Sequence, residues 1–353
     1  MKKIFISILA VAAMAACTKS EVAYEAADEI SFAPVAKNIT KAALTGTYPT
    51  DQKLGVYANY GSPESETSVT EDNLSSFRTA FLADAEFSYK TTTIATTSIS
   101  AWGGAGEGYA WPTNGSLVFA GYSKPASGEV GTKREYDFAD DELKITGYVQ
   151  SLDPASSFDL GWFCRTSKSY NYRNQAKAVD VTLSHALSWI EILVYGEGTT
   201  IASGNPWTIT SITINNVSNT GNVICTGSGV EKATWSNLGS ATNTITVFSG
   251  SQPLTGSAVV CETKDTDVLV IPQVPTAVGA VPEVATLTVK YTYDTPAGSA
   301  IPEQVVTLPL TVTGGWKSGY KYTYTLHFKS SEILIAPKYD EWANGGNQTV
   351  VVE

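Results

Sequence analysis

Apolar and polar residues alternate with a period of two along much of the chain. The clearest runs are WTITSITINNV (207–217), TNTITVFSG (242–250), VATLTVKYTYDT (284–295) and YKYTYTLHF (320–328). Such alternation is typical of strands with one buried face. Turn residues separate the runs at about the 8–15-residue spacing found in β-sandwiches and barrels. We therefore predict an all-β fold, with TEDNLSSFRTAFLAD (70–84) as the best candidate for a brief helix.

The predicted strands fall into two groups along the chain. Residues 42–178 carry looser strands interrupted by long polar loops, whereas the strands of residues 179–353 are denser and more regular. The polar segment RTSKSYNYRNQAK (165–177) is the expected linker between them. The pattern predicts two antiparallel β-sandwich domains in tandem, covering residues 42–178 and 179–353.

The first sixteen residues (1–16) have the pattern of an export signal. Lys2 and Lys3 precede an apolar run of about ten residues, and small residues follow it. The run is too short to be a spanning helix. It ends in Ala-Ala-Cys and so resembles a bacterial lipobox, which predicts that Cys17 is lipidated and becomes the new N-terminus. An ordinary signal peptide followed by a chance cysteine is the alternative.

The charge of the chain argues against some classes of partner. The sequence contains 23 basic and 34 acidic residues, and removing Lys2 and Lys3 leaves 21 against 34, a net charge of 21 − 34 = −13. An acidic chain with no basic run is not suited to nucleic acid or to anionic lipid headgroups. We predict no nucleic-acid partner.

Three cysteines remain beyond Cys17: Cys164, Cys225 and Cys261. An odd number without CxxC spacing indicates neither a disulfide framework nor a metal site. A bridge between Cys225 and Cys261 and a set of buried thiols are both compatible with the sequence, and the buried thiols are favoured.

Catalytic motifs are missing from the sequence. The two histidines, His185 and His327, each lie within a strand-like run, and no GxSxG, HExxH or P-loop motif occurs. The acidic segment DFADDEL (137–143) carries four carboxylates that could gather Ca²⁺, namely Asp137, Asp140, Asp141 and Glu142. It lacks the EF-hand pattern, so a solvated acidic loop is favoured. We predict that the chain is not an enzyme and holds no cofactor or metal.

Tryptophans raise glycan binding as an alternative function, because an exposed indole ring can stack on a sugar face. The candidates are Trp102, Trp111, Trp162, Trp207, Trp235, Trp316 and Trp342. Most of them lie beside strand-like runs, where packing is the ordinary role of a large aromatic side chain. A surface glycan-binding lipoprotein therefore remains an alternative.

Seven motifs follow one another in an order that identifies a family resemblance. They are YAWPTNGSLVFAGYSKP (109–125), SFDLGWF (157–163), VTLSHALSWIEILV (181–194), TSITINNVSNTGNV (210–223), VLVIPQ (268–273), GGWKSGYKYTYTLHF (314–328) and APKYDEWANGG (336–346). In this order they resemble the fimbrillin-like family, the pilins of type V pili in Gram-negative anaerobes. The resemblance implies two transthyretin-like β-sandwich domains and a structural stalk or tip subunit of an adhesive surface pilus.

The resemblance also implies a route of assembly. The chain would be exported as a lipoprotein exposed on the outer membrane and anchored through Cys17. A surface protease would then cut after a basic residue between the first two strands, removing residues 17–41. The groove left behind would accept a strand from another copy or a related pilin, so head-to-tail contacts would build the fimbrium. A pilus anchor that keeps its lipid is an alternative role, and a host or bacterial surface ligand is a further expected partner.

The N-terminal parts of this route can be assigned to residues. The segment EISFAP (29–34) is the expected first strand, with Ile30 and Phe32 on one face. Lys41 is the preferred cleavage point and Lys37 the second candidate. Lys41 stands where the family typically has arginine, and an arginine-specific protease would not cut there. Processing by a protease that accepts lysine and no processing at all are the two alternatives.

The C-terminal segment NQTVVVE (347–353) is the expected donor strand. Its valines Val350, Val351 and Val352 form a β-branched run with high strand propensity. An ordinary edge strand of the second domain is the alternative for this segment.

Overall fold

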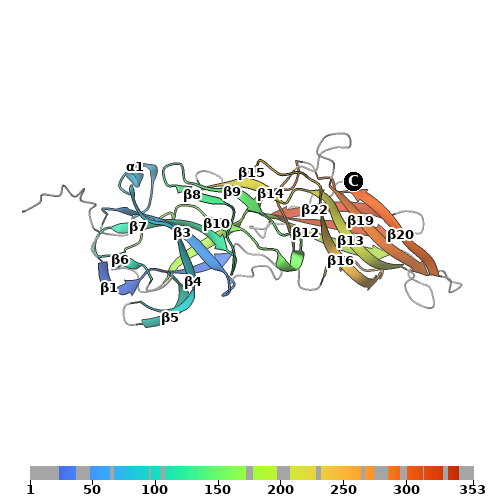
Figure 1. Cartoon of the computed structure of the whole chain (residues 1–353), viewed down its shortest axis with the longest axis horizontal. Helices are drawn as coiled ribbons and strands as arrows, with labels where there is room; N and C mark the ends of the chain where they lie inside the picture. Colours follow the sequence, from blue (N-terminus) through green and yellow to red (C-terminus); the bar gives the residue numbers. More distant parts are fainter. Residues whose placement is uncertain are drawn as a thin grey trace, which may run out of the picture.

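The computed structural model is almost entirely β-strand, which confirms the predicted fold class (Figure 1). The structure describes residues 24–36, 48–63, 67–94, 97–104, 108–171, 178–196, 207–227, 232–263, 267–273, 285–294, 300–312, 314–328 and 333–341. Its helices are one turn each, α1 (Glu71–Leu74) and η1 (Pro154–Ser156). Within these ranges no helix is long and apolar enough to cross a membrane.

Seven strands close into a barrel at one end of the elongated molecule (Figure 1). In spatial order they are β10 (Gly161–Phe163), β11 (Val179–His185), β2 (Ser31–Ala36), β5 (Thr97–Gly104), β4 (Thr79–Ile94), β3 (Lys53–Gly61) and β7 (Ser116–Lys124). The short pair β1 (Tyr24–Glu29) and β6 (Ala110–Pro112) lies beside it. Closure leaves no exposed sheet edge, which removes the main hazard of a soluble β-sheet.

Two further sheets form a sandwich at the other end of the molecule. One contains β17 (Val259–Val260), β12 (Ser188–Gly196), β21 (Tyr320–Phe328) and β22 (Ile333–Glu341), with β18 (Val268–Val270) also paired to β12. The other contains β16 (Asn243–Pro253), β13 (Trp207–Val217), β19 (Thr286–Asp294) and β20 (Ala300–Pro309). Their facing side chains form one hydrophobic cluster, as expected for two sheets packed face to face.

A fourth sheet joins strands from both halves of the sequence. Its order is β15 (Lys232–Ser236), β14 (Thr220–Thr226), β9 (Glu142–Val149) and β8 (Lys133–Asp137). The predicted boundary between residues 42–178 and 179–353 falls directly before β11, which is a strand of the barrel. The division into two tandem domains therefore stays a prediction.

Two strand pairs are parallel, although the sequence analysis expected antiparallel sheets throughout. Strand β2 runs parallel to β11, and β12 runs parallel to β21. Parallel neighbours cannot be joined by a tight hairpin, so they must come from distant parts of the chain. Local periodicity carries no information about the direction of such a distant partner.

The period-two pattern correctly located most of the regular strands. The predicted runs 207–217 and 320–328 coincide with β13 and β21 residue for residue. The helix predicted over 70–84 is wrong for most of its length, because α1 ends at Leu74 and β4 begins at Thr79. Pairing of β4 with β3 and β5 on its two sides outweighs the local helical spacing.

The expected linker, residues 165–177, is partly built into the barrel. Tyr170 and Leu117 exchange two backbone hydrogen bonds of 2.8 Å, and the Tyr170 side chain is buried. Residues 165–171 therefore lie along the barrel rather than as a free connection, and residues 172–177 lie outside the described ranges.

Two hydrophobic clusters hold the described chain together. The first fills the barrel and the space between the barrel and the β8–β9–β14–β15 sheet, and the second fills the sandwich. Cys225 belongs to the first cluster and Cys261 to the second, so no bridge joins them. Both cysteines, and Cys164, are thiols.

Burial also sets how the tyrosines respond to alkali. It raises the pKa of Tyr324 to about 12 and holds the pKa of other core tyrosines well above the ordinary value, namely Tyr48, Tyr57, Tyr122, Tyr136 and Tyr148. A pKa above that of the unfolded chain, about 10, favours the folded state below pH 10. This contribution is lost as the pH rises above that value.

We expect these tyrosines to ionise only together with alkaline unfolding. Absorbance at 295 nm, followed with far-ultraviolet circular dichroism, should show a cooperative step above pH 10 in which both signals change. In guanidinium, where the chain is unfolded, all the tyrosines should ionise in a single transition near pH 10. Complete and reversible ionisation of all 18 tyrosines with the strands intact would contradict the buried positions.

The N-terminal strand as the candidate functional site

Strand β2, from the predicted first strand, is an internal member of the barrel. It pairs in parallel with β11, in a register that runs from Phe32 opposite Val179 to Ala36 opposite Leu183. On its other side it pairs antiparallel with β5, where Ser31 lies opposite Gly103. The strand therefore fills the space between β11 and β5 and completes the ring.

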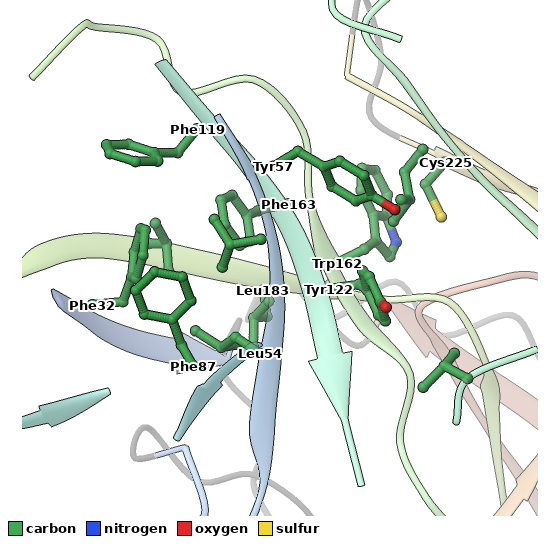
Figure 2. Close-up of a cluster of buried hydrophobic side chains, with 14 of the residues drawn as sticks. Phe32, Leu54, Tyr57, Phe87, Phe119, Tyr122, Trp162, Phe163, Leu183 and Cys225 are labelled. Atoms are coloured by element: carbon green, nitrogen blue, oxygen red, sulfur yellow. The ribbon is translucent and has the colours of Figure 1, made fainter. Parts of the chain in front are cut away.

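The side chains predicted to share one face point into the barrel. Ile30 and Phe32 are completely buried. The Phe32 ring meets Phe87 and Phe119 edge-on, at centroid distances of 5.0 and 5.1 Å, and Figure 2 shows it facing Phe87. Edge-to-face contact is a favourable geometry for aromatic rings. Burial of Ile30 and Phe32 contributes about 3–6 kcal/mol, at roughly 1.5–3 kcal/mol for each side chain.

Other features of β2 hold it less firmly. The Ser31 hydroxyl is buried and has no hydrogen-bond partner among the described residues, which is unfavourable. Pro34 has no N–H to donate to the sheet. Val35 on the outer face is 41% exposed. Besides its backbone pairing with β11 and β5, the strand is thus attached mainly through its apolar inner face.

An ion pair holds the end of β1, two residues before β2 begins. Lys90 of β4 lies 2.6 Å from a carboxylate oxygen of Glu29 and donates to the Gly104 carbonyl, also at 2.6 Å. A side chain at Gly108, where φ is +84°, would overlap the Glu29 carboxylate. Nothing in the sequence marks Lys90 as a partner of Glu29, because the two residues are far apart in the chain and no local pattern joins them.

A single cut between β2 and β3 would separate β2 from the rest of the barrel. Lys37 and Lys41, the predicted cleavage residues, lie in this connection. They and Cys17 lie outside the described residues. Departure of β2 would expose unpaired backbone groups on β11 and β5, together with the apolar holes left by Ile30 and Phe32.

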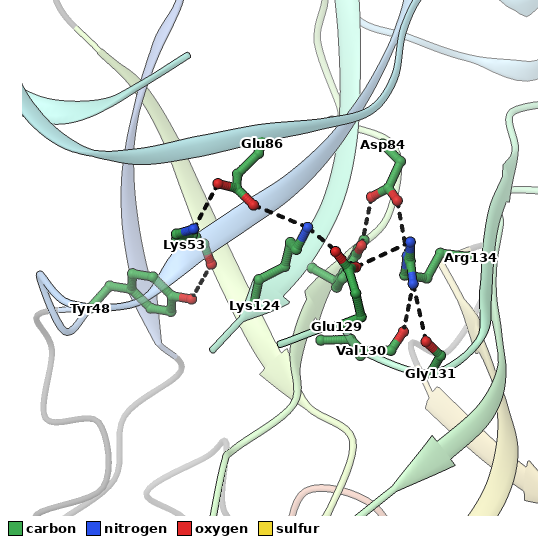
Figure 3. A network of polar contacts seen from close by, with 10 residues as sticks. Tyr48, Lys53, Asp84, Glu86, Lys124, Glu129, Val130, Gly131 and Arg134 are labelled. Carbon is green, nitrogen blue, oxygen red and sulfur yellow. Dashed lines mark hydrogen bonds and ion pairs between the residues drawn. The ribbon is translucent and has the colours of Figure 1, made fainter. Parts of the chain in front are cut away.

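A polar network joins barrel strands other than β2 (Figure 3). Lys124 of β7 bridges Glu86 of β4 and Glu129, at 3.2 and 3.6 Å. Lys53 of β3 lies 2.8 Å from Glu86, and its hydrogen bond lowers the pKa of that carboxyl. These contacts join β3, β4 and β7 without using any residue of β2.

Asp84 is a second centre of this network. It accepts hydrogen bonds from the Tyr122 hydroxyl at 2.6 Å and from Nε of Arg134 at 2.9 Å. Its φ of +51° marks an irregular point in β4, which the two bonds hold in place. The network therefore contains no residue of β2.

The histidines have packing roles. Nδ1 of His185 lies 2.6 Å from Asp159, with both side chains buried. The His327 ring stacks on Tyr195 at a centroid distance of 4.1 Å.

The acidic segment does not converge on one point. Asp137 accepts backbone N–H groups of Ala139 and Asp140, whereas Glu142 pairs with Lys144 at 2.9 Å. Asp141 is buried and hydrogen-bonded to Tyr136. In the described ranges no group of three or more His, Cys, Asp or Glu side chains is placed to hold a metal ion.

The tryptophans do not form a glycan platform in the described part of the chain. Four of them are buried, namely Trp102, Trp111, Trp162 and Trp316. Trp207 packs against Tyr291 and Tyr293, and the indole of Trp235 donates to the Ala186 carbonyl at 2.8 Å. The remaining predicted residues, Trp342 and the donor valines Val350, Val351 and Val352, lie outside the described ranges.

Comparisons with known proteins agree with this architecture. A sequence model described as fimbrillin-like matches residues 40–342. The structure is similar to a fimbrial protein from Bacteroides vulgatus, with a TM-score of 0.54 and 15% identity over 88% of this chain and 99% of that one. A protein proposed to act in cell adhesion, from Bacteroides uniformis, gives a TM-score of 0.48 and 15% identity over 89% and 98% of the two chains. No curated protein sequence matches the chain.

The barrel is completed by β2, a strand from the N-terminal part of the chain, and the fimbrillin-like match defines a structural protein rather than an enzyme. The match over residues 40–342 shows that the chain belongs to the fimbrillin-like family. It is therefore a pilin-type adhesion subunit of a cell-surface appendage, and it associates with other subunits into pilus polymers.

Proposed function

We propose that this chain is a stalk or tip subunit of a type V pilus and assembles by exchange of strand β2. It is exported as a lipoprotein anchored to the outer membrane through Cys17. Cleavage at Lys41 releases residues 17–41, or cleavage at Lys37 releases residues 17–37, and a strand from a neighbouring subunit takes the place of β2. The contact is head-to-tail, so it does not close on itself and builds a filament.

The observation that supports this proposal most directly is the position of β2. This strand, the second in the chain, lies between β11 and β5 in a closed barrel and carries the completely buried Phe32 on its inner face, with the completely buried Ile30 directly before it. Its loss would leave a defined groove between β11 and β5. An extended strand placed in this groove would form main-chain hydrogen bonds with β11 and β5. Every second side chain of that strand would fill the holes left by Ile30 and Phe32.

The donor proposed for this groove is the C-terminal segment 347–353 of a second subunit. Its β-branched residues favour the extended conformation, and their side chains are apolar. Filling the groove restores burial of apolar surface, which is the dominant driving force for association.

Controlled cleavage tests the proposal. The mature chain with Cys17→Ser is treated briefly with a lysine-specific protease, and mass spectrometry identifies the new N-terminus. We expect cleavage after Lys41, a chain beginning at Ala42, and SDS-resistant ladders on gels of unheated samples. The K37A/K41A variant is the matched control and should stay uncut in this segment and monomeric.

Two results would overturn the proposal. One is a chain correctly trimmed at Lys41 that stays monomeric and melts at the same temperature as the uncut chain. The other is a native protein recovered from cells with lipidated Cys17 as its N-terminus, which would identify a pilus anchor instead. A Lys41→Arg variant cut by an arginine-specific protease would show whether residue 41 determines which protease acts.

A further inference from the structure

Two cysteines meet where the barrel joins the β8–β9–β14–β15 sheet. Cys164 follows β10 of the barrel, and Cys225 lies in β14 of the adjoining sheet. The Sγ atom of Cys164 is 3.4 Å from the Cys225 carbonyl oxygen. Two cysteines 61 residues apart are therefore neighbours, with the Cys164 side chain against the Cys225 backbone.

The two cysteine side chains lie on the same side of β14. Gly227 is two residues after Cys225, so a side chain there would continue along the face on which the Cys225 side chain lies. A Cβ atom built on Gly227 would overlap the Cβ of Cys164. Cys164 thus packs against the face of β14 that carries the Cys225 side chain, in the space that is free because residue 227 is glycine.

Asp141 fixes both backbone segments. Its carboxylate accepts the N–H of Arg165, the residue after Cys164, at 2.8 Å. Its backbone carbonyl accepts the N–H of Gly227 at 3.0 Å. One buried residue therefore holds the two cysteine segments in a fixed relation.

The surroundings favour a cross-link between these two thiols over any other pair. Cys225 is completely buried within the first hydrophobic cluster, and Figure 2 shows it among the side chains of that cluster. Cys164 is partly exposed, so an oxidant can reach it. Burial raises the pKa of the Cys225 thiol, and the neighbouring Cys164 raises it further, so Cys225 stays protonated at neutral pH and the partly exposed Cys164 is the thiol that reacts first. Cys261 is buried in the second cluster and is not available to either.

We propose that Cys164 and Cys225 form a disulfide once the chain has been exported. The thiolate of Cys164 attacks the disulfide of a thiol–disulfide oxidoreductase and forms a mixed disulfide. The thiolate of Cys225 then attacks the Cys164 sulfur and expels the thiolate of the oxidoreductase. The two electrons reduce the oxidoreductase disulfide to a dithiol, and the two thiol protons end on that dithiol.

The bond would tie the barrel to the adjoining sheet. It would close a loop across the chain between β10 and β14, and such a loop restricts the unfolded chain. We expect the oxidised protein to melt on the order of 10 °C higher than the reduced protein. Strand β2 takes no part in this bond, so the inference is independent of strand exchange.

Peptide mapping tests the disulfide directly. The full mature chain is recovered from an oxidising periplasm without reductant, alkylated with iodoacetamide during denaturation, and digested. We expect a linked pair of peptides containing Cys164 and Cys225, with Cys261 alkylated. Reduction should lower the melting temperature of the wild type and of C261S, the matched control, and should leave that of C164S unchanged.

The opposite results are equally clear. If the native protein is treated with the oxidant diamide and Cys164 and Cys225 are still both recovered as alkylated thiols, no disulfide has formed and the proposal is overturned. A linked pair containing Cys261 would do the same. The mapping uses the wild-type chain, so its outcome does not depend on the folding of any variant.

Discussion

Replacing Phe32 by alanine should lower the free energy of unfolding of the barrel by about 3–5 kcal/mol. The ring is completely buried and packs edge-on against Phe87 and Phe119. Its removal leaves a cavity that rigid neighbouring strands cannot collapse to fill. Denaturant unfolding of the uncut chain measures the loss, and hydrogen exchange in peptides from β5 and β11 assigns it to the barrel.

Val35 provides the matched control because it lies on the same strand and is 41% exposed. We expect Val35→Ala to change the free energy of unfolding by less than about 1 kcal/mol. Equal effects of the two substitutions would mean that the inner face of β2 does not hold the strand in place. Faster exchange of β5 and β11 amides in the Phe32 variant alone would support a strand held by its inner face.

Two aspartates on one face of the proposed donor strand should abolish assembly. Side chains alternate along a strand, so Val350 and Val352 share one face and Val351 lies on the other. The holes left by Ile30 and Phe32 have the same two-residue spacing, and we expect Val350 and Val352 to fill them. An aspartate in an apolar groove is strongly unfavourable. The V350D/V352D variant, trimmed at Lys41, should therefore form no SDS-resistant ladder.

The V351D variant is the matched control, since it places a charge on the outer face of the same strand. It should assemble, and both variants should melt as uncut monomers at the wild-type temperature. Assembly of V350D/V352D, or of a chain lacking residues 347–353, would contradict the donor role. A lower melting temperature of the uncut deletion variant would instead identify 347–353 as an edge strand of the second domain.

The position of Asp141 between the Cys164 and Cys225 segments could not be predicted from the sequence. Cysteine spacing gave no reason to pair Cys164 with Cys225, and Asp141 looked like one member of a solvated acidic loop. Its burial, and its bonds to the backbone beside each cysteine, depend on β9 and β14 lying side by side. Only the tertiary arrangement creates that position.

The sequence by itself determined the local features of this protein. Period-two alternation located β13 and β21, placed Ile30 and Phe32 on one buried face, and identified an all-β fold. These features depend on neighbouring residues, whose side chains alternate for steric reasons alone. The order of motifs was enough to indicate the family.

Only the tertiary structure decided which strands are partners. It placed β2 between β11 and β5, made its pairing with β11 parallel, and brought Lys90 to Glu29. The physical reason is that any exposed strand edge can pair with any other, in either direction, through the same backbone groups. The choice is made by how the buried side chains of the whole barrel fit together, and no local pattern in the sequence contains that information.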